Sequence, residues 1–265
     1  MSSPRAIVIF DIDGVVRDVA GSYRRALADT VEQLTNQAYR PSPEAIDDLK
    51  GEGIWNNDWE ASRELVYRYF ESQGQPRQNL EIDYPQLVAF FQSRYRGSEP
   101  ENWNGYIANE PLLMSSSYLE TLTNDGILWG FFSGATRDSA EYVLQQRLGL
   151  RSPVLVAMED APGKPDPTGL FATVEQLYPD EPLPVFYAGD TVADMQTIRK
   201  AQLAQPNRNW FAVGILPPHI LASSPQRVER YKQGLKDAGA MIVLNHVEDL
   251  SGKVVQGVAE LEYDI

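Results

Sequence analysis

Short apolar runs recur along the chain, and each has the length of a β-strand. A run that is apolar throughout, rather than at alternate positions, is typical of a strand covered on both faces. The pattern therefore predicts a parallel sheet with helices on either side. The predicted strands are Ala6–Phe10, Ile127–Phe132, Val154–Met158, Val185–Ala188, Phe211–Ile215 and Met241–Leu244.

Helical stretches separate these runs. Gly149 and Gly239 follow two of them directly, and glycine is common just past the C-terminus of a helix. Alternation of strand, helix and strand predicts an α/β fold with a Rossmann-like parallel-sheet core and right-handed crossovers. The predicted helices are Pro111–Asn124, Asp138–Leu148, Pro167–Leu177, Val192–Ala204 and Pro225–Ala238.

The long segment between the first two strands has a different pattern. Residues 18–105 contain no convincing buried strand, and amphipathic stretches predict helices over Tyr23–Gln37, Trp59–Gln73 and Tyr84–Arg96. Linkers with proline or glycine separate these helices at residues 40–43, 74–76 and 97–100. We therefore expect an all-helical cap over residues 18–105, inserted after the first strand. The catalytic core would be discontinuous, formed by residues 1–17 and 106–265.

Composition excludes several classes of protein. The chain has 265 residues, 43% of them hydrophobic, and no cysteine, which excludes disulfides, cysteine-bound zinc, iron–sulfur clusters and thiol catalysis. Its net charge of −14 argues against nucleic acid and anionic lipid as partners. No apolar stretch approaches the roughly 20 residues that span a bilayer, and the first one is too short for a signal peptide. We expect a cytoplasmic protein, and the sequence does not indicate its oligomeric state.

Polar residues follow four of the predicted strands, where the carboxyl ends of a parallel sheet form its binding edge. Carboxylates, a hydroxyl and a lysine should therefore converge there. The four segments are Asp11-Ile12-Asp13-Gly14-Val15, Ser133-Gly134-Ala135-Thr136-Arg137, Gly163-Lys164-Pro165-Asp166-Pro167 and Gly189-Asp190-Thr191-Val192-Ala193-Asp194.

In order and spacing, these segments resemble the four motifs of the haloacid dehalogenase (HAD) superfamily. The resemblance covers nearly the whole chain and matches subfamily I/IA, whose helical C1 cap lies between the first and second motifs. It implies a magnesium-dependent phosphatase that hydrolyses a small phosphorylated metabolite through an aspartyl-phosphate intermediate. Dehalogenases of the superfamily lack an acidic residue two positions after the nucleophile, so the presence of Asp13 favours phosphoryl transfer.

The resemblance also implies roles for single residues. Asp11 would be the nucleophile and Asp13 the general acid and base, a pairing that needs one ionised and one protonated carboxyl. The strand must end here, and Gly14 permits the sharp departure of the chain. Lys164 would stabilise the phosphoryl charge. Ser133 with the backbone N–H groups of Gly134 and Ala135 would bind the phosphate.

Magnesium suits a site whose ligands are all hard oxygens. By resemblance, its ligands would be an Asp11 carboxylate oxygen, the Asp13 backbone carbonyl and the Asp190 carboxylate. Asp194 could support the metal through water or hold Lys164 in place. The cation and Lys164 would together reverse the local field, so that an acidic chain could still bind a phosphate. Simpler interpretations remain for these residues: solvated turn aspartates, helix caps at Asp190 and Ser133, and a surface lysine.

Substrate choice is expected in the cap. The segment Trp55, Asn56, Asn57 and Asp58 combines a flat apolar ring with hydrogen-bonding side chains, which suits a sugar or another ring. It could instead be a helix connection in which the tryptophans are core and Asn57 or Asp58 caps the next helix. Arg17 and Asp18, just beyond the first motif, could help to close the site or could be exposed.

Two other functions remain open. A sugar phosphomutase of the same superfamily shares the Asp-x-Asp-Gly-Val signature, so that motif does not distinguish it from a phosphatase. A non-catalytic metabolite-binding or scaffold protein could also have kept the fold, although such a role would not require Asp13 and Lys164 together.

Overall fold

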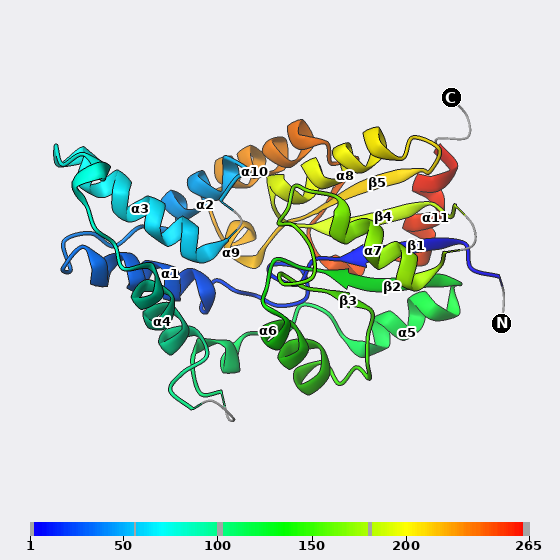
Figure 1. Cartoon of the computed structure of the whole chain (residues 1–265). Helices are drawn as coiled ribbons and strands as arrows, with labels where there is room; N and C mark the ends of the chain where they lie inside the picture. The colour runs from blue at the N-terminus through cyan, green and yellow to red at the C-terminus, as the bar shows by residue number, and fades with distance from the viewer. Residues whose placement is uncertain (1–2, 56, 100–102, 180–181, 262–265) are drawn as a thin grey trace. The chain divides into compact units, whose positions relative to one another are not determined.

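The chain forms two compact units. The structure is a computed structural model and describes residues 3–55, 57–99, 103–179 and 182–261. Unit 1 consists of residues 1–18 and 112–265, and unit 2 of residues 19–111 (Figure 1). Each unit is described by itself below.

Unit 1 contains a six-stranded sheet, all of whose strand pairs are parallel. The strand order is β3-β2-β1-β4-β5-β6, which confirms the predicted α/β fold with a Rossmann-like core. The strands are β1 (Ala6–Phe10), β2 (Ile127–Phe132), β3 (Leu155–Val156), β4 (Val185–Gly189), β5 (Trp210–Ile215) and β6 (Ile242–Leu244).

The register of the central strands sets the positions of the polar residues that follow them. Phe10, the last residue of β1, is paired with Phe131 of β2 and Ala188 of β4. Asp11, Ser133 and Asp190 therefore all lie within two residues of these paired positions. Parallel pairing brings them to the same edge of the sheet.

Both faces of the sheet are covered. Ile7 and Ile9 of β1 belong to an apolar core that includes Leu170, Met195 and Leu235 from three helices. The ring of Phe10, at 6.2 Å between centroids, contacts Tyr118 on another helix. The core helices are α7 (Thr168–Leu177), α8 (Val192–Ala204) and α10 (Pro225–Ala238), and Tyr118 lies on α5 (Ser116–Asn124); Figure 1 shows α5, α7, α8 and α10 around the sheet.

Some boundaries differ from the prediction for local reasons. Helix α5 begins at Ser116, not Pro111, because the Ser115 side chain accepts a hydrogen bond from the Tyr118 N–H and caps the helix there. Strand β3 has only two residues and lies at the edge of the sheet, where it pairs with β2 alone. The helix after β2 also differs: α6 (Arg137–Glu141) continues as a π-helical segment over Tyr142–Arg147.

Among the described residues, three α-helices lie outside the predicted set. Residues 40–43 read as a linker, but α2 (Pro43–Gly51) begins at Pro43, since proline is well suited to the first helical turn and Ser42 accepts from the Ala45 N–H. Near the C-terminus, α9 (Pro218–Leu221) is too short for its pattern to be recognised, and α11 (Gly252–Leu261) follows the last strand.

In its described residues, unit 2 is helical. Helix α1 (Tyr23–Leu34) packs against α3 (Asp58–Ser72) and α4 (Tyr84–Tyr95). Leu27, Val31, Leu65, Leu87 and Phe91 are buried side chains on these three helices. None of the helices in the described part of the chain is long and apolar enough to cross a bilayer.

The core of unit 1 can be tested with a matched pair of leucines. Leu170 on α7 is 0% exposed, whereas Leu203 on α8 is 83% exposed. Leu170→Ala should lower the free energy of unfolding by about 2–5 kcal/mol, because it deletes apolar atoms whose burial stabilises the fold and leaves a cavity in their place. Leu203→Ala should change it by less than about 0.5 kcal/mol. Urea unfolding of both variants checks this, and equal losses would contradict the described core.

Candidate active site

Asp11 is the first residue after β1 and is buried at the carboxyl edge of the sheet. Its backbone N–H donates to the carbonyl of Ala188 on β4 at 2.8 Å. Its carboxylate oxygen Oδ1 accepts from the Ile12 N–H, also at 2.8 Å. The backbone of the neighbouring strand and the following turn therefore fix where the carboxylate lies.

The turn after Asp11 brings the backbone against Asp190. Gly14 has a φ of +75°, and a Cβ atom at this position would lie 2.2 Å from Asp190 Oδ2. Only glycine accepts both this conformation and this approach. The first and fourth motif segments are therefore in direct contact at Gly14 and Asp190.

Asp13 forms an ion pair with Arg17. The Arg17 Nε–H donates to Asp13 Oδ1 at 2.7 Å, and the Arg17 side chain is fully buried while that of Asp13 is 23% exposed. The interpretation of Arg17 as an exposed residue is wrong. Its spacing of four residues from Asp13 is the only sequence signal of this ion pair.

Lys164 lies between two carboxylates. Its Nζ is 2.9 Å from Asp11 Oδ2 and 2.7 Å from Asp194 Oδ1, and the lysine side chain is 1% exposed. The interpretation of Lys164 as a solvated surface residue is therefore wrong. The structure also contains a contact between Lys164 and Asp194. Holding Lys164 is one of the two roles that the sequence allows for Asp194.

Asp190 follows β4, and Asp194 lies in the first turn of α8. Thr191 begins this helix with a capping box: its side chain accepts from the Asp194 N–H, and Asp194 Oδ2 accepts from the Thr191 N–H. Oxygen atoms of Asp11, Asp190 and Asp194, all buried, lie within 4.8 Å of one another. Such a group of hard oxygen donors fits a divalent cation.

The two oxygens of Asp194 already have several donors. Oδ1 accepts from Lys164 Nζ at 2.7 Å and from the Tyr187 hydroxyl at 3.0 Å. Oδ2 accepts from the N–H and the hydroxyl of Thr191 at 2.9 and 2.6 Å. A carboxylate has about four lone-pair positions. Asp194 is thus suited to holding Lys164, and Asp11 and Asp190 are better placed to bind a cation.

Burial and neighbouring charges shift the pKa values of Asp11, Asp194 and Lys164 in different directions. Burial raises the pKa of Asp11 to about 7, against the opposing effect of Lys164. Burial also acts against ionisation of Asp194, but Lys164 and Thr191 outweigh it and lower the pKa of this carboxyl. For Lys164, burial would lower the pKa, yet Asp11 and Asp194 raise it above its usual value. The lysine is therefore a fixed cation.

Ser133 follows β2 and is held in a local loop. Its N–H donates to the Val156 carbonyl at 3.0 Å, and its hydroxyl accepts from the Ala135 N–H at 3.1 Å. Helix α6 is preceded by Thr136, so Ser133 is not the cap of that helix. The loop of Ser133, Gly134 and Ala135 lies at the carboxyl end of β2, one strand away from Asp11.

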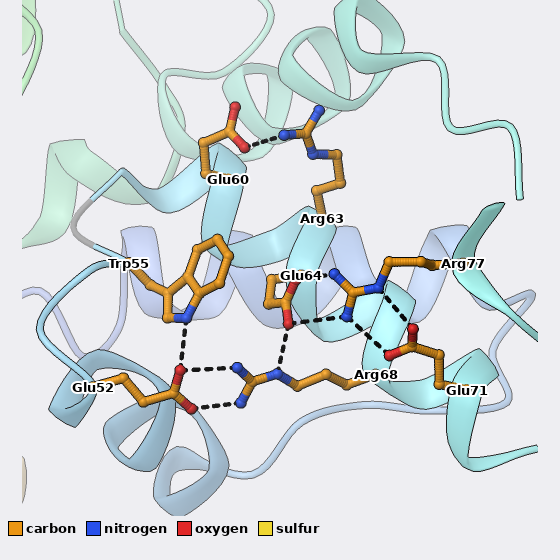
Figure 2. Close-up of polar contacts among 8 residues, drawn as sticks. All are labelled: Glu52, Trp55, Glu60, Arg63, Glu64, Arg68, Glu71 and Arg77. Carbon is orange, nitrogen blue, oxygen red and sulfur yellow. Dashed lines mark hydrogen bonds and ion pairs between the residues drawn. The ribbon is translucent and has the colours of Figure 1, made fainter.

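The predicted specificity residues lie in unit 2, at the connection between α2 and α3. Figure 2 shows Trp55 donating through its indole N–H to Glu52, at 2.8 Å. Glu52 in turn accepts two hydrogen bonds from Arg68, at 2.6 and 2.8 Å. Trp55 and Trp59 are half-buried, so the alternative that placed them in the core is not supported.

Asn57 and Asp58, at the start of α3, make local contacts within unit 2. The Asn57 side chain accepts from the N–H groups of Trp59 and Glu60 and caps α3, as the alternative interpretation of this segment expected. Asp58 forms an ion pair of 2.6 Å with Lys50. Asn56 lies outside the described residues. Contact of these residues with a substrate stays a prediction.

Tyr187 is a member of the site that sequence reasoning missed. It lies within β4, is 0% exposed, and donates to Asp194 Oδ1 at 3.0 Å. The only signal in the sequence is a hydroxyl-bearing residue inside an otherwise apolar strand, two positions before Gly189.

Comparisons with known proteins identify the family of this chain. A family model described as haloacid dehalogenase-like hydrolase matches residues 6–202. A curated protein from Phytophthora nicotianae, named imidazoleglycerol-phosphate dehydratase, is 29% identical over 250 residues. That match covers 92% of this chain and 51% of the relative, so the chain spans about half the relative's length.

Solved structures share the fold. A phosphonoacetaldehyde hydrolase-like protein from Oleispira antarctica has a TM-score of 0.67 at 18% identity, covering 96% of this chain and 92% of that one. The phosphatase Tt82 from Thermococcus thioreducens has a TM-score of 0.61 at 22% identity, covering 78% and 92%. A β-phosphoglucomutase from Clostridium difficile has a TM-score of 0.61 at 14% identity, covering 99% and 100%.

The raised pKa of Asp11 predicts how stability depends on pH in the metal-free protein. Between its ordinary value of 3.8 and its folded value of about 7, the folded state holds more protons on this carboxyl than the unfolded state does. The free energy of unfolding should therefore fall as pH rises through this window. Asp11→Asn removes the titrating group, so we expect the variant to be more stable than the wild type at about pH 8 but not at about pH 4.

Urea unfolding of both proteins at these two pH values, in the presence of a chelator, measures the difference. A wild type that is more stable than Asp11→Asn at the higher pH would contradict the assigned environment of Asp11.

Proposed function

Because the chain belongs to the haloacid dehalogenase-like hydrolases, we propose that it is a phosphatase that hydrolyses the phosphate monoester of a small metabolite. The single observation that carries the proposal is the buried contact of Lys164 with Asp11 and Asp194, beside Asp190. This arrangement offers one nucleophilic carboxylate, one fixed cation and a set of oxygen ligands.

Magnesium is the cation that we propose for the site. The carboxylates of Asp11 and Asp190 would hold it, together with the backbone carbonyl of Asp13. The three buried carboxylates, Asp194 included, carry three formal negative charges and Lys164 offsets one, so a divalent cation would balance the remaining two. When bound, magnesium would withdraw negative charge from the phosphoryl oxygens and lower the pKa of Asp11.

Transfer of the phosphoryl group would begin at Asp11. One carboxylate oxygen of Asp11 forms a bond to phosphorus while the bond from phosphorus to the ester oxygen breaks. Asp13, in its protonated form, gives its proton to the departing oxygen. Lys164 offsets the charge on the phosphoryl oxygens throughout this step.

Hydrolysis of the aspartyl-phosphate would complete the cycle. Asp13, now ionised, accepts a proton from a water molecule as the water oxygen bonds to phosphorus. The bond between phosphorus and Asp11 breaks, which releases inorganic phosphate and restores both carboxyl groups. The ion pair with Arg17 holds the Asp13 side chain, which is 23% exposed.

The remaining predicted residues have supporting roles. Ser133 and the N–H groups of Gly134 and Ala135 would bind the phosphoryl oxygens. Unit 2 would act as the cap that excludes bulk water, and Trp55 with Asn57 and Asp58 would contact the organic part of the substrate.

A sugar phosphomutase is the second candidate. Structures named as β-phosphoglucomutases share the fold at 13–17% identity, a level that shows the fold alone. Incubation with a sugar 1-phosphate distinguishes the two reactions, because a mutase yields the 6-phosphate and a phosphatase yields free phosphate.

The name of the curated relative gives one direction for the substrate. Because this chain matches only about half of that protein, we do not transfer the dehydratase activity. An imidazole-bearing phosphate monoester such as histidinol phosphate nevertheless belongs in the substrate panel, beside sugar phosphates, phosphoglycolate, phosphoserine and nucleotides.

Release of inorganic phosphate from this panel tests the proposal. We expect the wild type to hydrolyse at least one member with magnesium and to lose activity with a chelator. Asp11→Asn should lower kcat at least about 10³-fold, since no other residue supplies the nucleophile. Asp237→Asn, an exposed aspartate on α10, is the matched control and should retain full activity. Hydrolysis by Asp11→Asn at the wild-type rate would refute the mechanism.

A further inference from the structure

Tyr187 is a buried polar residue in the centre of the site for which the mechanism above has no use. It lies on β4 with 0% exposure, in the apolar core beneath the carboxyl edge of the sheet. Its hydroxyl is 3.0 Å from Asp194 Oδ1 and 3.1 Å from the backbone carbonyl of Phe132. Both of these atoms are acceptors, so the single hydroxyl hydrogen is shared between them.

The two acceptors belong to different parts of the site. The Phe132 carbonyl ends β2 and immediately precedes Ser133, whereas Asp194 lies on α8 and contacts Lys164. Strand β1, which ends next to Asp11, lies between β2 and β4 in the sheet. The Tyr187 side chain therefore spans β1 and connects the phosphate-binding loop to the lysine-holding carboxylate.

The ring of Tyr187 also contacts the lysine. Lys164 Nζ is 5.3 Å from the centroid of the Tyr187 ring and 5.4 Å from that of Phe132. Both distances are within the range of cation–π attraction. Lys164 is thus held by two carboxylates and two aromatic rings, and Tyr187 contributes to both kinds of contact.

We propose that Tyr187 is a positioning residue for phosphoryl transfer: its hydroxyl and ring hold Asp194 and Lys164 in place relative to Asp11 and the Ser133 loop. This inference rests on the proposed phosphatase function. Loss of the hydroxyl leaves Lys164 as the only donor to Asp194 Oδ1 among the described residues, and the ammonium is then drawn toward Asp194 and away from Asp11. A shift of a fraction of an ångström at a charged group affects the transition state more than the ground state.

Tyr187→Phe removes the hydroxyl and preserves the volume of the ring, so the fold should persist. The matched control is Tyr178→Phe, which removes a hydroxyl from a partly buried tyrosine packed against the same core. We expect Tyr187→Phe to lower kcat about tenfold while KM changes by less than about twofold. Tyr178→Phe should leave both constants unchanged.

Direct binding of orthovanadate with magnesium, measured by calorimetry, gives a readout that does not need turnover. Vanadate mimics the five-coordinate transition state, so its affinity should fall by about the same factor as kcat, whereas the affinity for inorganic phosphate should stay within about twofold. If the role of Tyr187 were purely structural, Tyr187→Phe would lower the melting temperature but would change the affinities for vanadate and phosphate by the same factor.

A double-variant cycle shows whether the effect passes through Lys164. In a Lys164→Met background, Tyr187→Phe should cause no further loss of vanadate affinity, since the group that it positions is absent. An equal loss in both backgrounds would overturn the inference, as would a Tyr187→Phe variant with the wild-type kcat. A wild type that neither hydrolyses the panel nor binds vanadate would instead refute the proposed function itself.

Discussion

The placement of several buried charges beside one another is the constraint on which the rest of the structure depends. Asp11, Asp190 and Asp194 lie together at the carboxyl edge of the sheet, and Lys164 lies between two of them. Burying like charges is costly unless a counterion or hydrogen bonds compensate. Lys164 offsets one charge, and the proposed divalent cation would offset two more. With that cation bound, the net charge of −14 on the chain would be no obstacle to the proposed phosphorylated ligand.

The backbone passes close to the carboxylates at two glycines, and this brings the charged groups together. Parallel pairing of β1 with β4 brings the first and fourth motif segments to the same edge. Gly14 allows the turn after Asp11 to contact Asp190, and a Cβ atom at Gly189 would lie 2.3 Å from the Cβ of Asp194. The first turn of α8, capped by Thr191, then directs Asp194 toward the lysine. Glycine and capping residues matter here as much as the charged groups do.

Local patterns were sufficient to predict the core elements but not the contacts between distant residues. Four elements have the predicted bounds: β1, β2, α8 and α10. Continuous apolar runs indicate the two strands, and capping residues indicate where the two helices begin or end. The Tyr187 contact could not be predicted, because it joins residues on three elements. Arg17 was left open for the same kind of reason: its burial depends on packing, and an arginine after a turn is usually exposed. Asn57 shows the remaining ambiguity, since an amide serves equally well as a helix cap or as a ligand-binding group.

Trapping the phosphorylated enzyme tests the central claim most directly. Asp13→Asn lacks the base for the second step, yet acetyl phosphate has a leaving group that needs no proton from the enzyme. After incubation of this variant with acetyl phosphate and magnesium, acid quenching and peptide mass spectrometry should locate one phosphoryl group on Asp11. A phosphoryl group on another residue, or stoichiometric phosphate release with no adduct on Asp11, would contradict the account.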